Sequence, residues 1–358
     1  PQISHTNVKN QQFLDIAWFH NAIHYMWNMI HFSFSYLLSL ISATETILVS
    51  LFNFAPEDAL FEEGDDFADL FGSKRGGDKF LGVYSKEEIT TMIQNSPMAE
   101  KISQLGYPDW EVDFDLSDCF QHYGYIRSQS LQAKDAYLGF IICQVGDYQF
   151  PNDIDILTKK MLTYGSRLNM LNIRWFSLQN PKGHFTPDRP RLPGQKYPGT
   201  GLAKDAFLIF HELAERNHRD GIVNVPEHFH NAYGYKNFLF LNPYRQGAFL
   251  KLVHELKADI HEKGLAMVSW AIYLGYCYYQ DSPNQTTFER QYKWDPSDQI
   301  FPISKRTINY FTGAYYKIRC KSTYDKSPGF KIDWEGAEKQ CLSSILHYSD
   351  KENQMTSQ

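Results

Sequence analysis

A proline-rich connector, a two-glycine turn and an amphipathic segment follow one another between residues 180 and 218, and they constrain the fold most. The turn reads Pro-Gly-Gln-Lys-Tyr-Pro-Gly-Thr-Gly over residues 193–201. After it, apolar residues recur at the spacing of a core-facing helix, namely Leu202, Ala206, Ile209, Phe210 and Leu213. A glycine turn that leads into a helix leaves free backbone amides at the positive end of the helix dipole. The sequence therefore predicts an anion site there, with a phosphate-bearing cofactor as the first candidate ligand.

Segments of strand and helix character alternate on both sides of this turn. Residues 110–116 alternate apolar and acidic side chains with the period of a strand. Further strands are predicted at 80–84, 120–127, 136–145, 169–178, 221–226 and 238–241, and helices at 85–105, 202–218, 228–235, 245–262 and 334–346. This order predicts an α/β fold with a mixed sheet flanked by helices.

The N-terminal region is apolar, and residues 16–44 contain no Asp, Glu, Lys or Arg. The run is long enough to span a bilayer, but Ser, Asn and His dilute it and no basic flank marks a cytoplasmic side. A helical hairpin packed on protein, a helix at a membrane surface and a true span all remain open. His20 and His24 share a helical face in this run, and packing is the simpler interpretation than a metal or haem pair.

Composition changes along the chain suggest four parts. These are an apolar helical segment at 1–56, an acidic and glycine-rich linker at 57–78, an α/β domain at 79–265 and an aromatic-rich C-terminal extension at 266–358. The net charge of −6 argues against a general nucleic-acid binder. Five scattered cysteines without a Cys-x-x-Cys pair, and no secretory signal, predict an intracellular protein, either cytoplasmic or membrane-associated.

Two common phosphate-binding patterns do not fit the turn. A dinucleotide fingerprint needs a third glycine and a later acidic residue, and a Walker loop needs Gly-Lys-Ser/Thr. Metal binding is not predicted either, because His211-Glu212 lacks the second histidine of a zincin helix and His228-Phe229-His230 lacks a third ligand at motif spacing.

The order of elements and two short motifs resemble the GNAT superfamily of acyl-CoA-dependent N-acyltransferases. Lys196-Tyr-Pro-Gly-Thr-Gly201 resembles its pyrophosphate-binding turn, Gln/Arg-x-x-Gly-x-Gly/Ala, with Lys at the first position. Downstream, Asn231-Ala-Tyr-Gly-Tyr-Lys-Asn-Phe-Leu-Phe240 resembles the segment that carries the family tyrosine, which falls on Tyr235. Leu239 stands where Gly is common, and the Ala-to-Tyr spacing is one residue short. The resemblance covers roughly residues 110–241.

The resemblance implies acetyl-CoA or another acyl-CoA as cofactor and an amine, on a small molecule or a protein, as acceptor. Its pyrophosphate would lie on the turn, whose residues are Lys196, Tyr197, Gly199, Thr200, Gly201 and Leu202. The preceding strand would separate from its neighbour and bind the pantetheine arm. Tyr235 would protonate the leaving thiolate as general acid. The general base stays open, with Glu227, His228 and His230 as candidates by proximity alone.

Two alternative functions remain possible besides that of a transferase. The chain would be a non-catalytic GNAT-like binding or interaction module if the missing carboxylate on the strand at 171–178 reflects lost activity. Alternatively, it would be a membrane-associated subunit of a larger complex, with residues 16–54 contacting a membrane surface or a protein partner.

Overall fold

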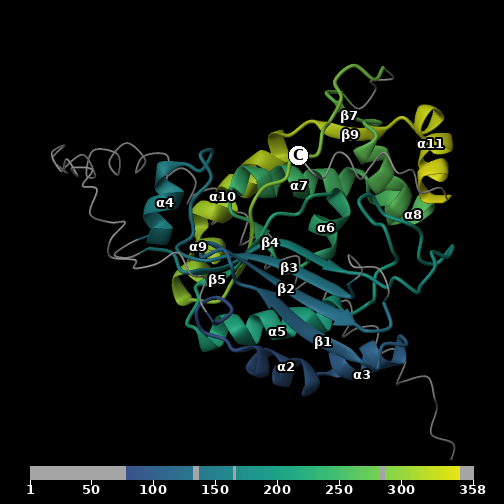
Figure 1. The fold of residues 1–358 in the computed structure, drawn as a ribbon. Helices are drawn as coiled ribbons and strands as arrows, with labels where there is room; N and C mark the ends of the chain where they lie inside the picture. Colours follow the sequence, from purple (N-terminus) through teal and green to yellow (C-terminus); the bar gives the residue numbers. More distant parts are fainter. Residues whose placement is uncertain (1–77, 132–136, 164–166, 283–286, 347–358) are drawn as a thin grey trace, which may run out of the picture. The chain divides into compact units, whose positions relative to one another are not determined.

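The computed structural model describes residues 78–131, 137–163, 167–282 and 287–346. Its main element is a seven-stranded sheet in the order β1-β2-β3-β4-β5-β8-β6, and a second sheet pairs β7 with β9 (Figure 1). The strands are β1 (Trp110–Asp115), β2 (Gln121–Ser128), β3 (Gly139–Gln144), β4 (Met170–Leu178), β5 (Gly221–Asn224), β6 (Leu239–Phe240), β7 (Cys277–Gln280), β8 (Gln299–Pro302) and β9 (Gly329–Ile332). The fold is therefore α/β with a mixed sheet, as predicted.

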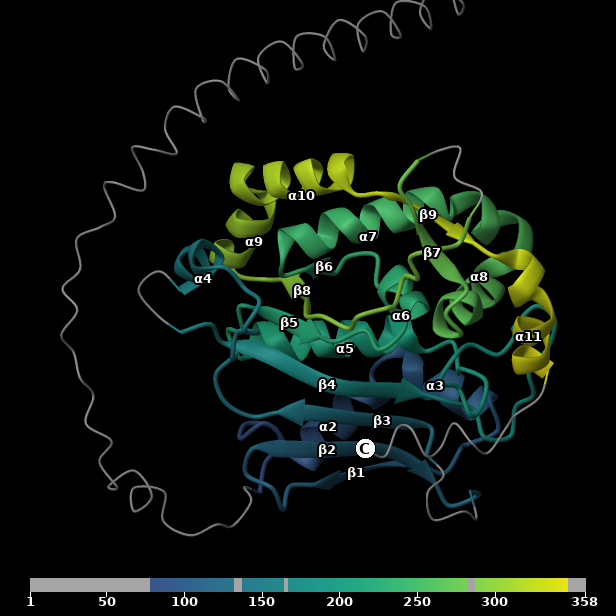
Figure 2. The same ribbon diagram turned by 90° about the horizontal axis from the view of Figure 1, so that it is seen from above.

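Ten helices are described within these residues. They are α2 (Lys86–Gln94), α3 (Pro97–Gln104), α4 (Ile156–Thr163), α5 (Ala203–Arg216), α6 (Phe229–Gly234), α7 (Pro243–Glu255), α8 (Lys257–Tyr273), α9 (Lys305–Thr312), α10 (Ala314–Lys326) and α11 (Trp334–Leu346). In Figure 1, α2, α3 and α5 lie together on one side of β1–β4, and their buried side chains share one hydrophobic core with these strands. Figure 2 shows β1 to β4 side by side, with α7 and α10 beyond β6 at the other end of the sheet.

The pairing of β4 with β5 is the one parallel contact in the described sheet, and it is short. It joins Met170 to Gly221, Leu171 to Ile222 and Asn172 to Val223, and then it stops although β4 continues to Leu178. On its other side β4 pairs with β3 from Asn172 to Leu178, with Arg174 as an extra residue between Ile173 and Trp175. Such a bulge bends a strand locally. Beyond Asn172, β4 therefore presents a backbone edge that β5 does not cover.

Some predicted boundaries are wrong for identifiable reasons. Residues 80–84 form a tight turn closed by a single Phe80–Tyr84 bridge rather than a strand. A helix starts after Ser85 as predicted, through a capping box of Ser85 and Glu88, but it breaks at Ser96, which is extended because Pro97 follows it. Residues 245–262 span two helices, since α7 ends at Glu255 and α8 begins at Lys257.

The C-terminal extension takes part in the main sheet. Its strand β8 lies between β5 and β6, antiparallel to both. No helix among the described residues is long and apolar enough to cross a membrane. The predicted apolar segment at 1–56, with His20 and His24, and nearly all of the linker at 57–78 lie outside the described residues.

Candidate functional site

The glycine turn lies beside the end of β4. Gln179 and Gly199 form an isolated antiparallel bridge, and the amide of Asn180 donates to the carbonyl of Pro198 at 2.7 Å. Gly199 and Gly201 are exposed, and a Cβ at Gly199 would meet nothing closer than the Leu178 carbonyl at 3.8 Å. Gly201 has a φ of +77°, a conformation that favours glycine. The backbone of the turn is therefore open to a ligand.

The first turn of α5 has unused backbone donors. Leu202 is the N-cap residue and makes no side-chain cap, and the amides of Ala203 and Lys204 have no acceptor among the described residues. Asp205 places a buried carboxylate in this turn, but the ammonium of Lys101 lies 2.7 Å from it and offsets its charge. Free amides at a helix N-terminus bind anions. The predicted anion site is thus geometrically available.

The other predicted residues of the turn divide into exposed and buried positions. Lys196 is exposed, with its Nζ atom 5.5 Å from the ring centroid of Tyr197. Thr200 and Leu202 are buried, and the Thr200 hydroxyl accepts from the Leu202 amide at 3.3 Å. Lys196 can therefore supply a mobile cation to a bound phosphate, whereas Thr200 fixes the shape of the turn.

The connector before the turn is held by the C-terminal helices, a role that the sequence did not indicate. Arg191 is 2 % exposed, and its guanidinium donates to the carbonyl of Gln195 at 2.7 Å and of Ser344 at 3.1 Å. The indole of Trp270 in α8 donates to the Arg191 carbonyl at 2.9 Å. These contacts hold the segment Arg191–Gln195, here called the buttress, in a fixed position directly before the glycine turn.

Tyr235 lies at the C-terminal end of α6, on the side of the sheet that α5 covers. Its ring centroid is 5.6 Å from that of Phe238, which lies 5.7 Å from that of Phe207 in α5. Burial raises the pKa of Tyr235, and its hydroxyl has no hydrogen-bond partner within the described ranges. A protonated phenol with a free donor suits a general acid.

The three base candidates named from the sequence are poorly placed for that role. His228 is the N-cap residue of α6, where its backbone amide donates to the Asn231 side chain, and burial lowers the pKa of its imidazole to about 4. Burial and the neighbouring His228 lower the pKa of His230 to about 3. The two rings stack with centroids 5.5 Å apart. Glu227 is exposed. No group of three potential metal ligands occurs in the part of the chain that the structure describes.

A buried carboxyl group that the sequence did not single out lies just before β8. Asp298 is 8 % exposed, and it accepts a short hydrogen bond from the Tyr148 hydroxyl. Burial raises its pKa, the one carboxyl pKa so raised among the described residues. In a separate contact, the side-chain amide of Asn172 in β4 donates to the Gln144 side chain at 3.0 Å. Neither interaction has a signature that a sequence motif would reveal.

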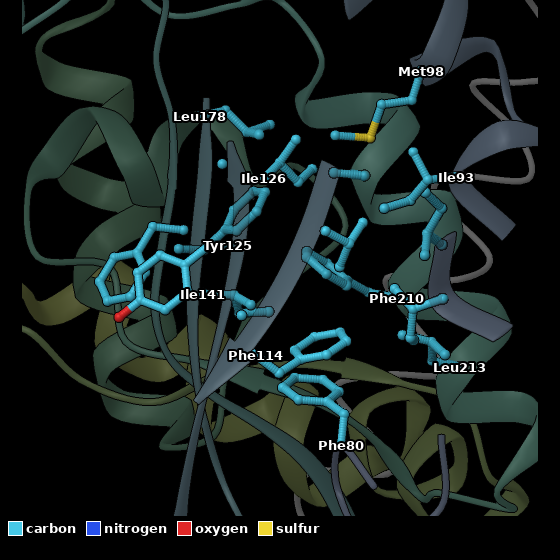
Figure 3. Close-up of a pocket in the computed structure, with 18 residues that line it drawn as sticks. Phe80, Ile93, Met98, Phe114, Tyr125, Ile126, Ile141, Leu178, Phe210 and Leu213 are labelled. Atoms are coloured by element: carbon cyan, nitrogen blue, oxygen red, sulfur yellow. The ribbon is translucent and has the colours of Figure 1, made fainter. Parts of the chain in front are cut away.

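An apolar cavity of about 70 Å³ lies between β1–β4 and the helices α2, α3 and α5 (Figure 3). In Figure 3 the rings of Phe80 and Phe114 stack at one end, 4.7 Å apart, and Met98 and Leu178 lie at the other. Its lining contains no charged side chain. The cavity therefore belongs to the core, and its lining holds no carboxylate and no imidazole.

Together, the described residues place an open glycine turn and a strand edge that β5 does not cover beside the carboxyl end of β4, with a partly buried phenol on the α5 side of the sheet. This arrangement can bind a phosphate at α5, an extended chain along β4, and a group that receives a proton from Tyr235. No protein-family model matches the chain, and no curated protein matches it.

Proposed function

We propose that the chain is an acyl-CoA-dependent N-acyltransferase with a GNAT-like domain, acting on an amine. The observation that carries the proposal is the separation of β4 from β5 after Asn172 and Val223, with the glycine turn and α5 connecting the two strands. A parallel pair that opens at its carboxyl end leaves backbone donors and acceptors for an extended ligand. The bulge at Arg174 bends β4 at this same point.

In this proposal the cofactor is acetyl-CoA or another acyl-CoA. Its pyrophosphate would bind the free amides of the glycine turn and of Ala203 and Lys204, with the Lys196 ammonium as counter-charge. The pantetheine amides then pair with the free edge of β4, as an added strand would. The thioester would then lie next to the opening between β4 and β5, which begins after Asn172 and Val223, within reach of groups at the end of β5.

The transfer itself needs an amine nucleophile and a proton for the leaving group. The amine nitrogen attacks the thioester carbonyl, and the C–S bond breaks as the new C–N bond is completed. The Tyr235 phenol, held protonated by burial, donates to the departing thiolate and regains a proton from the amine. The products are an amide and free coenzyme A.

Thiol release from acetyl-CoA, measured with a panel of primary amines, tests this proposal. Tyr235→Phe should lower kcat by about a hundredfold or more and leave the Kd for acetyl-CoA unchanged. Tyr233→Phe is the matched control and should retain kcat, because Tyr233 lies two residues earlier and packs against Phe229 in a separate hydrophobic cluster. Binding of acetyl-CoA without any turnover would instead indicate the non-catalytic module.

Location and partners follow from the proposed cofactor. Acyl-CoA is an intracellular metabolite, so we propose an intracellular protein, cytoplasmic or attached to a membrane surface through residues 16–54. Flotation with liposomes separates these alternatives, since deletion of residues 16–54 should abolish flotation if this segment is the anchor.

A further inference from the structure

Two side-chain amides lie opposite each other on strands β5 and β8, and their buried carbonyl oxygens accept no hydrogen bond from the described residues. Asn224 and Gln299 are directly opposed in the antiparallel register. The Asn224 Oδ1 and Gln299 Oε1 atoms are both buried, and neither has a hydrogen-bond partner among the described residues. Gln299 is only 1 % exposed. Since buried acceptors are normally paired, these two oxygens are free to accept hydrogen bonds from a bound molecule.

The pair lies where β5 has just left β4. Asn224 is the last residue of β5 and follows Val223, the last residue paired with β4. Side chains alternate along a strand, so Asn224 shares a face with Ile222, and Gln299 shares one with Phe301. Ile222 and Phe301 both pack in the core that contains α5. The two amides therefore face the α5 side, at the end of β5 that lies next to the opening.

The same face carries Tyr235. The ring centroid of Phe301 lies 5.8 Å from that of Phe238, and Phe238 contacts Tyr235. Around the opening, the described residues thus provide two unpaired carbonyl oxygens and one unpaired phenol. Each of these groups retains a hydrogen-bonding capacity that the fold leaves unused.

We infer that the carbonyl oxygens of Asn224 and Gln299 bind the primary amine of the acceptor. This role deepens the proposed function and rests on it. Each oxygen accepts one N–H, which satisfies both orphaned acceptors and leaves the nitrogen lone pair free for the thioester. Uncharged amides do not offset an ammonium charge, so desolvation favours the neutral amine and its extra proton stays in water.

This arrangement accounts for a strand β4 without a carboxylate. Because the amine enters already neutral, no side chain has to remove a proton before attack. Once the C–N bond has formed, the nitrogen loses one proton while the sulfur gains one, and Tyr235 can pass it between them. The amide pair positions the nucleophile during both steps.

Direct binding of n-butylamine to the purified full chain, by calorimetry in alkaline buffer and without acyl-CoA, tests the inference. Butyltrimethylammonium, which has no N–H, is the matched ligand and should not bind. Asn224→Leu and Gln299→Met should each weaken n-butylamine binding by about tenfold or more. Both should leave the Kd for acetyl-CoA within about twofold, because neither amide contacts the proposed pyrophosphate site.

Unfolding measurements make the test independent of misfolding. Replacing an unpaired buried amide with an apolar side chain should keep or raise stability. Ser269→Ala removes another buried hydroxyl without a described partner, on α8, and should leave amine binding unchanged. Unchanged n-butylamine affinity in both amide variants, or equal binding of butyltrimethylammonium, would overturn the inference. If acetyl-CoA alone fails to bind while n-butylamine does, the transferase proposal fails and the amine site stands.

Discussion

Gly194 lies directly against the imidazole of His228, and a Cβ atom on Gly194 would come within 2.6 Å of Nε2. Gly194 also has a φ of +76°, which favours glycine. This contact joins the connector before the glycine turn to the start of α6. The segment before the proposed cofactor site and the helix before the proposed general acid can thus approach this closely only because Gly194 has no side chain.

Gly194→Ala should therefore destabilise the protein by about 2–3 kcal/mol, through backbone strain and overpacking combined. Urea unfolding measures the change. The double variant Gly194→Ala/His228→Ala should recover part of the loss, because the ring that clashes is gone. Equal stability of Gly194→Ala and the wild type would contradict this packing.

Arg191 should matter for cofactor binding although it lies outside the turn. Arg191→Lys removes the planar guanidinium that reaches the Gln195 and Ser344 carbonyls, and we expect a loss of about 1–3 kcal/mol in stability. The Kd for acetyl-CoA should rise in the same variant. Trp270→Phe keeps an aromatic ring but leaves the Arg191 carbonyl unpaired, so both effects should recur at smaller size. A variant that loses stability with unchanged Kd would separate the buttress from the site.

The two glycines of the turn should respond differently to alanine. Gly201→Ala should cost about 1 kcal/mol of stability because of its positive φ, whereas Gly199→Ala meets no close atom and should cost less than about 0.5 kcal/mol. Both variants should bind acetyl-CoA more weakly than the wild type. Gly146→Ala is the matched control, since Gly146 has a φ of +107° in open space away from the turn. It should lose stability like Gly201→Ala and bind acetyl-CoA normally.

Acid should destabilise the fold through the stacked histidines. Burial holds the pKa of His228 at about 4 and of His230 at about 3, whereas an unfolded histidine titrates near 6.5. Below about pH 6.5 these histidines bind protons in the unfolded chain but stay neutral in the folded chain. The free energy of unfolding therefore falls as pH drops toward the folded pKa values. Each histidine contributes a slope of about 1.4 kcal/mol per pH unit in this window.

His230→Leu should remove the contribution of one histidine, about 1.4 kcal/mol per pH unit, measured by urea unfolding near pH 6 and near pH 5. His261→Leu is a suitable control, because His261 is an exposed residue of α8. Identical slopes in the wild type and His230→Leu would show that His230 is protonated in the folded protein.

Local patterns in the sequence predicted the local elements well. The alternation in β1, the helix start at Ser85 and the apolar face of α5 each depend on neighbours within a few residues, and each was confirmed. The insertion of β8 between β5 and β6 was not predicted, because pairing between residues 221–224 and 299–302 leaves no local trace.

The same distinction between local and long-range features applies to the candidate site. The glycine turn and its helix are contiguous in sequence, and so they could be found before the structure. The opposed amides of Asn224 and Gln299, and the Arg191 contacts with Trp270 and Ser344, join residues 75 or more positions apart. Such residues carry no spacing rule, and only the register of the sheet and the packing of the C-terminal helices bring them together.

Calorimetric titration of acetyl-CoA into the purified chain tests the central claim most directly. We expect saturable binding by the wild type and by Gln129→Glu, which adds a negative charge on an exposed turn after β2. Gly199→Glu, which places the same charge in the open turn, should abolish binding without loss of stability. Absence of binding by the wild type at millimolar acetyl-CoA, or equal binding by Gly199→Glu, would contradict the account.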